Sequence, residues 1–517
     1  MKLPLDKWRR LLLAEGGLPL VWLTLTALVL IPVWHQRLLP MLDTPNHLAL
    51  ARAWHSYHDA SYHISDYYTL RIRPVPYLVF YTFIHFCMYV FSIEVANKIF
   101  LSIYLILFPL SVLALARALK RSPWLAVGGF ALAFSQPWIY GFSSYLLGTV
   151  FMMLGFAALI RYLADKRTFD LIQILIYSLL AYLCHILPWF VFGLGSIGIL
   201  LVHWKRWRAG AFAAFSMMPS LALAIVAILE EQADHTYFNR GNKFVGIWRD
   251  FPTSVLEFPR RVMELFPGNL DTLVLIVLSA TAVGLAVWKG TRSTEQTREE
   301  QKVLPLLLLL MGLTYVSLPY QVSKPIYWWY LSPRLPSMMA PLLMLWPSVK
   351  LKGRQRLLML PVVAACIALP IKLARLYRDF SNRNAPFTRL VSELPRGSST
   401  LVVARGMMRG QHSEEESGDP ATSAPVYWHF SSWPMAIHGG YDPYLFDQGI
   451  PVRPRVTLRA PAWSTPDTFD IRQAPDFDYY LVRFAPAQME QEPSLKLLDQ
   501  VGDWSLFQRT AKLTDEP

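Results

Sequence analysis

Charged residues are scarce in this sequence: only 16% of its 517 residues are charged, whereas 54% are hydrophobic. This balance excludes an ordinary soluble enzyme of such length, because the hydrophobic residues fall in long runs and not at amphipathic spacing. An apolar run of about 18 residues or more can cross a membrane as a helix. The first run, residues 17–34, follows the basic start MKLPLDKWRR, and no small-residue cleavage site comes after it. We therefore predict an uncleaved first span and not a signal peptide.

Cysteine is also scarce. Cys87, Cys184 and Cys366 all lie in apolar segments, which excludes a disulfide framework and a zinc site at the usual spacings. We expect them to be small buried side chains. The sequence also lacks any Asn-x-Ser/Thr acceptor for glycosylation and any internal repeat. The missing acceptor is in keeping with a bacterial inner (plasma) membrane.

Acidic residues are fewer than basic ones, 36 against 49, and the net charge is +13. The basic residues stand in short clusters between apolar runs, which is typical of cytoplasmic loops and not of a nucleic-acid interface. We expect no nucleic acid as a partner. The clusters that we place in the cytoplasm are residues 116–121, 165–167, 205–208, 289–302 and 350–356.

With a cytoplasmic N-terminus, these clusters predict eleven spans and a C-terminus outside. The spans are residues 17–34, 95–117, 123–139, 144–163, 169–185, 188–204, 210–229, 270–288, 303–320, 335–349 and 357–374. The apolar run 74–92 is the exception, because counting it as a span would invert every later loop. We interpret it as a helix that lies along the outer membrane face.

The predicted fold is thus an α-helical polytopic membrane protein, with residues 1–379 as the transmembrane domain and 380–517 as an extracytoplasmic α/β domain. Residues 35–94 and 230–269 form two large outer loops. For the C-terminal domain we predict helices at 386–395 and 493–502 and strands at 399–404, 478–484 and 504–509. Residues 406–425 are predicted to be a mobile loop.

The stretch DTPNH, residues 43–47, carries polar groups directly after the first span. Thr44 is expected to cap a helix that begins at Pro45, which leaves Asp43 just outside it. Asp43 then either supports the helix dipole or serves as a general base whose pKa is raised near lipid. Asn46 and His47 are placed to orient that carboxylate or a substrate hydroxyl.

Further histidines follow at positions 55, 58 and 63, so a metal site at this helix is an alternative. No carboxylate stands at a matching spacing, and the interpretation that we prefer is ordinary interfacial histidines without a metal or other cofactor.

The other candidates lie at the outer ends of predicted spans. Arg334 is the first choice for binding a phosphate, with a snorkelling interfacial anchor as the alternative. His185 either belongs to the site or is a hydrogen-bonded histidine between helices. Tyr140 and Tyr145 either line a cavity or belong to the aromatic belt. The second choices for cationic groups are Lys324, Arg71 and Arg73.

The stretches DTPNHLALARA, YGFSSYLLG and AYLCHILPW, together with the order of spans and outer loops, resemble the GT-C class of membrane glycosyltransferases. The resemblance implies a sugar donor linked to a polyprenyl phosphate, an extracytoplasmic acceptor and, by position, Asp43 as the base. Asp43 is followed by Thr44 and not by a second acid, which departs from the paired-acid pattern of metal-dependent members.

The resemblance, added to the predicted topology, implies a membrane glycosyltransferase of the inner membrane, whose polar loop meets one substrate in lipid and another in water. The mid-span positions are almost free of charged residues, which disfavours a transporter or a lipid-linked-saccharide flippase. The alternative from another class is a non-catalytic scaffold, a subunit of an envelope assembly, because fold does not imply activity.

Overall fold

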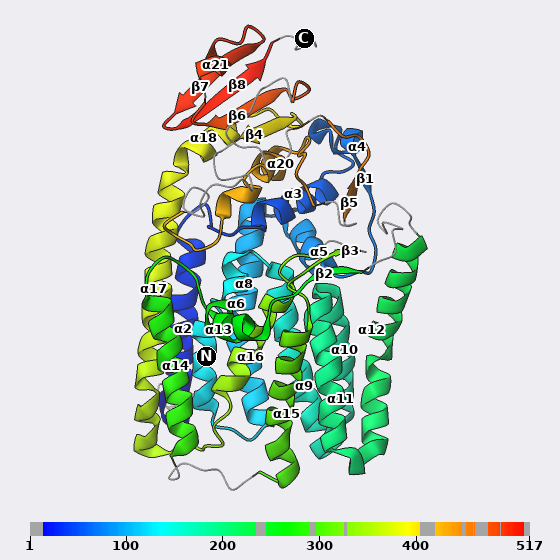
Figure 1. Ribbon diagram of the computed structural model, residues 1–517, viewed down its shortest axis with the longest axis vertical. Coiled ribbons are helices and arrows are strands. Elements are labelled where there is room, and N and C mark those ends of the chain that lie inside the picture. The colour runs from blue at the N-terminus through cyan, green and yellow to red at the C-terminus, as the bar shows by residue number, and fades with distance from the viewer. Residues whose placement is uncertain are drawn as a thin grey trace, which may run out of the picture.

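The computed structural model describes residues 14–233, 244–288, 296–324, 328–403, 419–446, 451–458, 460, 474–485 and 487–510. Long helices stand side by side, and a small β-sheet lies at one end of the bundle (Figure 1). Short helices and loops lie between the sheet and the bundle. The fold is therefore a helical polytopic one with a C-terminal sheet, as the sequence predicts.

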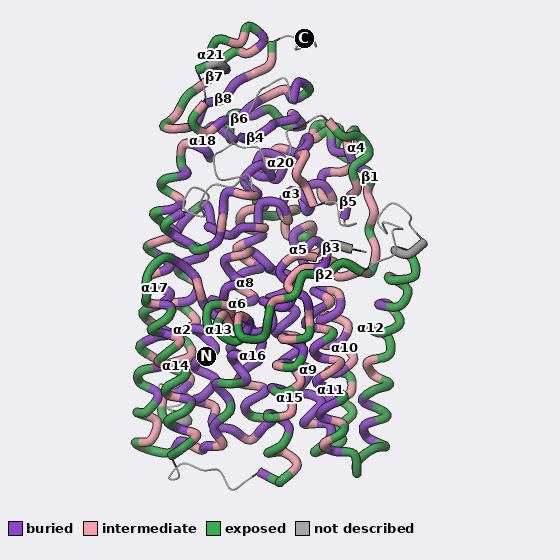
Figure 2. Tube along the Cα trace, viewed as in Figure 1, coloured by how far each residue is buried: buried purple, intermediate pink, exposed green. Residues whose placement is uncertain are grey.

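Six helices in the described residues are long and apolar enough to cross a membrane. They lie within α2 (Ala14–Trp34), α6 (Ile93–Ala118), α9 (Ser143–Asp165), α12 with the turn before it (Trp207–Ala233), α14 (Leu270–Val287) and α17 (Leu360–Arg383) with the turn before it. The helices α10 (Thr168–Cys184), α11 (Ile186–Val202) and α15 (Arg298–Ser317) complete the bundle. Exposed residues line the outward faces of α12 and α17 (Figure 2), where lipid takes the place of water in a membrane.

Two predicted spans are not continuous helices. Residues 123–139 form the short pieces η2 (Pro123–Gly128), α7 (Gly129–Leu132) and α8 (Gln136–Ile139). Residues 335–349 contain only α16 (Leu335–Met344). Pro137 lies in the first turn of α8, where proline is tolerated, and Pro347 follows the end of α16, where it disfavours a helical conformation for Trp346 before it. Residues 123–139 are nevertheless almost wholly buried, whereas Leu343 and Trp346 are exposed in the second stretch.

The predicted surface helix at 74–92 is shorter than expected, because α5 covers only Leu78–Cys87. It packs against α3 (Thr44–His55) and α6. Phe86, Tyr89 and Val90 at its end are strongly exposed, which is consistent with a segment that meets the membrane surface.

The C-terminal sheet has the strand order β4-β6-β8-β7. The strands β4 (Thr400–Val403), β6 (Tyr479–Arg483) and β8 (Trp504–Arg509) confirm the three predicted strands, and α18 (Ala385–Glu393) confirms the first predicted helix. The helix predicted at 493–502 is wrong. Leu495–Val501 is the strand β7, which pairs antiparallel with β8. The segment has a local helical pattern, but its pairing along the whole of β8 makes it a strand.

Residues 419–446 form a segment that lies on α3, and we call it the cover segment. It contains η7 (Val426–His429) and α20 (Ser432–His438), and α20 packs on α3 (Figure 1). Arg52 of α3 donates to the Ala436 carbonyl at 3.0 Å, and Arg383 at the end of α17 is ion-paired with Asp419. The rest of the predicted mobile loop, residues 406–418, lies outside the described residues.

A tight turn at residues 139–142 holds the start of α3. The amides of Leu42 and Asp43 donate to the carbonyls of Ile139 and Tyr140 at 3.0 and 3.1 Å. Gly141 has a φ of +74°, and a Cβ there would lie 2.9 Å from both the amide nitrogen and the Oγ1 of Thr44. Glycine at this position therefore permits both the left-handed turn and the close approach of the two segments.

We expect Gly141→Ala to lower the melting temperature more than Gly353→Ala does. Gly353 also has a positive φ of +50°, but nothing lies within 4 Å of its added Cβ. Alanine therefore strains the backbone at both sites, by about 1 kcal/mol, and meets the start of α3 only at position 141. The measurement is thermal unfolding of both variants in the same detergent. Equal melting temperatures would contradict the close approach at Gly141.

Candidate functional site

Asp43 lies immediately before α3, and its carboxylate does not cap that helix. Asp43 occupies the N-cap position with φ −84° and ψ −10°, and its side chain makes no capping hydrogen bond. The sequence-based prediction that Thr44 is the cap is wrong, because Thr44 is the first residue of the helix and its buried Oγ1 has no hydrogen-bond partner. The carboxylate of Asp43 is therefore available for another purpose.

Burial controls the charge of this carboxylate. Only 13% of the Asp43 side chain is exposed. Desolvation by burial raises the pKa of Asp43 to about 7, against the opposing effect of the Arg334 guanidinium. A carboxyl group whose pKa lies near neutrality can accept a proton at physiological pH, which a normal aspartate with a pKa near 4 does poorly.

His429 of the cover segment lies next to Asp43. Its Nε2 is 3.4 Å from the Asp43 Oδ1, and 5% of its side chain is exposed. Burial lowers the pKa of His429 to about 3, so the imidazole is neutral at physiological pH. Sequence reasoning missed this residue. It stands in the aromatic stretch VYWHF, far from Asp43 along the chain, and no local pattern marks it.

Arg334 is buried in the turn η5 (Ser332–Arg334) before α16, with an exposure of 6%. Its Nε donates to the Tyr330 carbonyl at 2.8 Å, and its Nη1 donates to His185 Nε2 at 2.9 Å. The guanidinium also stacks on the Phe142 ring at 3.8 Å. The groups that Arg334 contacts in these interactions are all neutral. Because its guanidinium is buried, Arg334 is not an interfacial anchor that extends its charge to the membrane surface.

His185 joins α10 and α11 and is completely buried. A guanidinium only donates hydrogen bonds, so Nε2 of His185 accepts from Arg334 and Nδ1 carries the ring proton. The Leu187 amide, 3.1 Å from Nδ1, is then a contact and not a second hydrogen bond. The structure therefore pairs two of the predicted site residues, His185 and Arg334, directly.

Tyr145 and Tyr140 lie in the same interior region and not in an exposed aromatic belt. The Tyr145 hydroxyl donates to the Arg334 carbonyl at 2.5 Å. The ring of Tyr140 stacks on Tyr330 at 4.7 Å, and its carbonyl accepts the amide of Asp43. Both tyrosines thus fix the backbone around the two charged residues.

Asn46 and His47, in the first turns of α3, have separate partners. The Asn46 amide donates to the Tyr444 carbonyl and accepts from the Phe446 amide, both at 2.9 Å. It is therefore used in holding the cover segment. His47 Nδ1 is 2.8 Å from the Tyr81 hydroxyl, and burial, aided by Arg334, lowers the pKa of His47 to about 3.

The second-choice cations Arg73 and Arg71 have described contacts with groups other than Asp43. Arg73 forms an ion pair of 3.4 Å with Glu230 of α12. The Arg71 amide donates to the Pro451 carbonyl beside the short pairing of β1 (Tyr68–Leu70) with β5 (Val452–Pro454). Lys324 ends β3 (Gln321–Lys324), and its side chain lies outside the described part of the chain.

The histidines that the sequence offered as metal ligands contact different partners. His55 Nδ1 is 3.1 Å from the His85 carbonyl oxygen, and His63 pairs with Asp66 at 2.8 Å. No group of three or more His, Cys, Asp or Glu side chains in the described residues is arranged to hold a metal ion. The three cysteines are free.

No protein-family model matches the sequence, and no curated protein matches it. Among solved structures, the chain is similar to ArnT from Cupriavidus metallidurans, which was crystallised bound to undecaprenyl phosphate. The similarity covers 96% of this chain and 98% of ArnT, with 11% sequence identity and a TM-score of 0.49. Since this level of similarity carries no information on activity, the function of the chain has to be inferred from the contacts of its own residues.

Proposed function

We propose that the protein is a membrane glycosyltransferase that moves a sugar from a polyprenyl-phosphate donor to an acceptor hydroxyl, with Asp43 as the general base. The observation that carries this proposal is the buried Asp43 carboxyl, which caps no helix and whose pKa is raised to about 7. A structural aspartate at a helix start would instead be expected to cap the helix and to keep a low pKa.

The chemistry needs one proton acceptor and one stabilised leaving group. The acceptor hydroxyl gives its proton to Asp43 as its oxygen bonds to the anomeric carbon of the sugar. The bond between that carbon and the phosphate oxygen breaks, and the electron pair leaves on the phosphate. General-base catalysis of this kind contributes roughly 10²–10⁴-fold to the rate.

Arg334 is the group that we assign to the phosphate. A buried cation whose direct partners are neutral is costly, and an anionic ligand would offset that cost. Guanidinium groups also match phosphate oxygens in geometry. The electrostatic effect of Arg334 on the pKa of Asp43 supports the nearness of the two charges. Fixed charge at the leaving phosphate stabilises the transition state without reorganisation.

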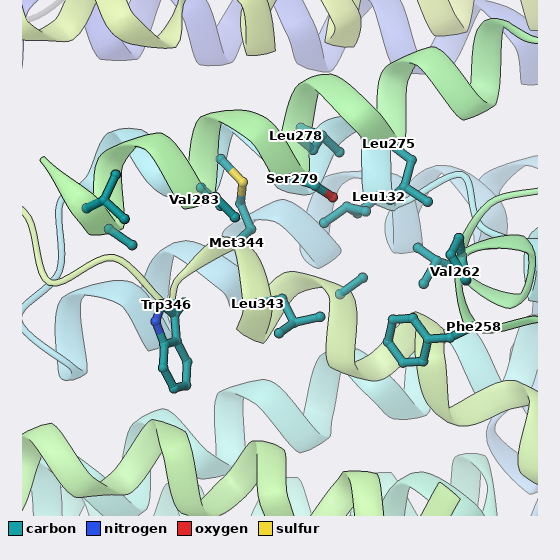
Figure 3. Close-up of a pocket in the computed structure, with 15 residues that line it drawn as sticks. Leu132, Phe258, Val262, Leu275, Leu278, Ser279, Val283, Leu343, Met344 and Trp346 are labelled. Carbon is teal, nitrogen blue, oxygen red and sulfur yellow. The ribbon is translucent and has the colours of Figure 1, made fainter. Parts of the chain in front are cut away.

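The lipid chain of the donor needs an apolar site, and we assign it to a pocket of about 540 Å³ between α13 (Phe251–Val262), α14, α16 and α7. Such a volume is usual for ligand pockets, which measure about 300–1,000 Å³. Leu275 and Leu278 of α14 lie across the pocket from Leu343 of α16 (Figure 3). Ser279 and Trp346 are the lining residues with polar side-chain atoms.

This pocket is open to lipid and is linked to the site. Ser279 and Val283 in its lining are exposed on the bundle surface. The helix α13, which closes one end of the pocket with Phe258 and Val262, also carries Arg261, whose Nη1 donates to the Tyr330 hydroxyl at 2.7 Å. Tyr330 in turn stacks on Tyr140 beside Asp43. A chain in the pocket would therefore lie one helix away from the proposed chemistry.

Asp43→Asn is expected to lower transfer from a radiolabelled polyprenyl-phosphate sugar by about 10²–10⁴-fold without lowering the melting temperature. In the wild type, kcat/KM should rise with pH and level off above pH 7, because the base must be ionised and burial raises its pKa to about 7.

The matched control for this experiment is Asp59→Asn, an exposed aspartate of the same loop that caps a short turn at Ser61. It should keep both the rate and the pH profile. Full transfer by Asp43→Asn would exclude Asp43 as the base, and loss of the same size in both variants would point to a general effect on the loop. A non-catalytic scaffold would show no transfer in any variant.

Ala286→Trp is expected to raise KM several-fold for a long-chain polyprenyl donor and to change it little for a donor with a chain of one or two isoprene units. Ala286 is half-buried in the pocket lining, so an indole fills the space. The control Ala222→Trp adds the same side chain to an exposed position of α12. Equal KM values for the long-chain donor in both variants would exclude the pocket as its site.

The sheet end of the bundle is expected to face the periplasm, where the acceptor lies. Lys496→Cys in β7 and Lys205→Cys before α12 place exposed thiols at the two ends, in a chain whose three natural cysteines are replaced by alanine. A membrane-impermeant maleimide should label Lys496→Cys in intact spheroplasts and Lys205→Cys only after permeabilisation. The reverse labelling would overturn the orientation.

A further inference from the structure

His429 is the basic side chain that the structure places against the carboxylate of Asp43. The distance of 3.4 Å between its Nε2 and Oδ1 of Asp43 joins two side chains that are both largely buried. The His429 ring lies 4.9 Å from the Phe446 ring, which belongs to the same cover segment. One of the two residues thus comes from the start of α3, and the other comes from the C-terminal part of the chain.

Several other titratable or charged groups face Asp43, and each has a different position or partner. His47 of α3 points its Nδ1 at the Tyr81 hydroxyl of α5. Tyr77, before α5, bonds to Arg334, which acts on Asp43 through its charge. Among the described residues, His429 supplies the nitrogen within ion-pair distance of the carboxylate.

The cover segment is held on α3 by contacts that fix where His429 stands. Asn46 binds the backbone of Tyr444 and Phe446, and Arg52 binds the carbonyl of Ala436. Since α3 begins directly after Asp43, the base and the segment that carries His429 are tied to one helix. Displacing the cover segment would separate the imidazole from the carboxylate.

We propose that His429 is a positioning residue for Asp43: its Nε2–H is donated to Oδ1 and leaves Oδ2 to take the proton of the acceptor. This inference rests on the proposed function and adds that the base is assembled only when the cover segment lies on α3. A neutral imidazole that donates to a carboxylate favours the ionised form of that carboxylate. His429 keeps its own proton throughout, so the proton of the acceptor stays on Asp43 until it is released to water.

The test compares His429→Phe with His429→Gln in the pH dependence of kcat and KM. Phenylalanine keeps the site buried and removes the donor, so the midpoint of the pH profile should rise by about one unit. Transfer at pH 7 should fall several-fold and recover at pH 9, with KM little changed. Glutamine carries an N–H at a similar reach and should restore the wild-type midpoint.

The matched control is His438→Gln, because His438 lies in the same segment and its Nε2 contacts the Val391 carbonyl at 2.8 Å, away from Asp43. It should leave the midpoint unchanged. If His429 were merely structural, His429→Phe would lower the melting temperature and kcat without moving the midpoint. That result, or glutamine behaving as phenylalanine does, would overturn the inference.

A second readout separates this inference from the proposed function. Infrared difference spectroscopy follows the carboxyl stretch of Asp43 with pH, and Asp43→Asn identifies the band. A midpoint that rises in His429→Phe, in a protein that transfers no sugar, would support the pair and reject the transferase. An unchanged carboxyl midpoint in an active enzyme would reject the pair alone.

Discussion

The site depends on a backbone constraint, the docking of residues 42–43 on the turn at 139–142. Two amide–carbonyl hydrogen bonds and the close approach of Gly141 set where α3 begins. With its start fixed in this way, α3 takes Asp43 at its N-cap position, yet the carboxylate turns away from the helix amides. The carboxylate is then buried between α3 and the cover segment, and that burial raises its pKa to about 7.

The polar groups around Asp43 and Arg334 add hydrogen bonds without adding charge. His47 and His429 have a lowered pKa because burial disfavours the imidazolium form. His185 accepts a hydrogen bond from Arg334 and is neutral for that reason. Among these five groups, charge is therefore carried by the Asp43 carboxylate and the Arg334 guanidinium, which suits a reaction that removes a proton at one end and develops phosphate charge at the other.

The helix α13 connects the polar region with the apolar one. Its residues Phe258 and Val262 line the pocket that faces the bundle surface, while Arg261 reaches Tyr330. Arg261 is ion-paired with Glu257 on the same helix at 2.6 Å, so its charge is largely compensated. In the described part of the chain, Arg334 is not ion-paired with a residue of its own helix, and its direct partners Tyr330 and His185 are neutral. This difference decides between the two arginines as the phosphate ligand in our proposal.

A long apolar run in a membrane forms a helix, because a helix satisfies its own backbone polar groups in lipid. The sequence by itself therefore predicted most of the bundle. It also predicted Asp43, His185 and Arg334 as candidate site residues, since a polar residue at the end of an apolar span stands out from its neighbours in the sequence. Tertiary structure alone decided the broken segments at 123–139 and 335–349, the strand at Leu495–Val501 and the use of Asn46 as a clamp. It also decided the pairing of Asp43 with His429, because contacts between segments far apart in the chain leave no periodicity or spacing in the sequence.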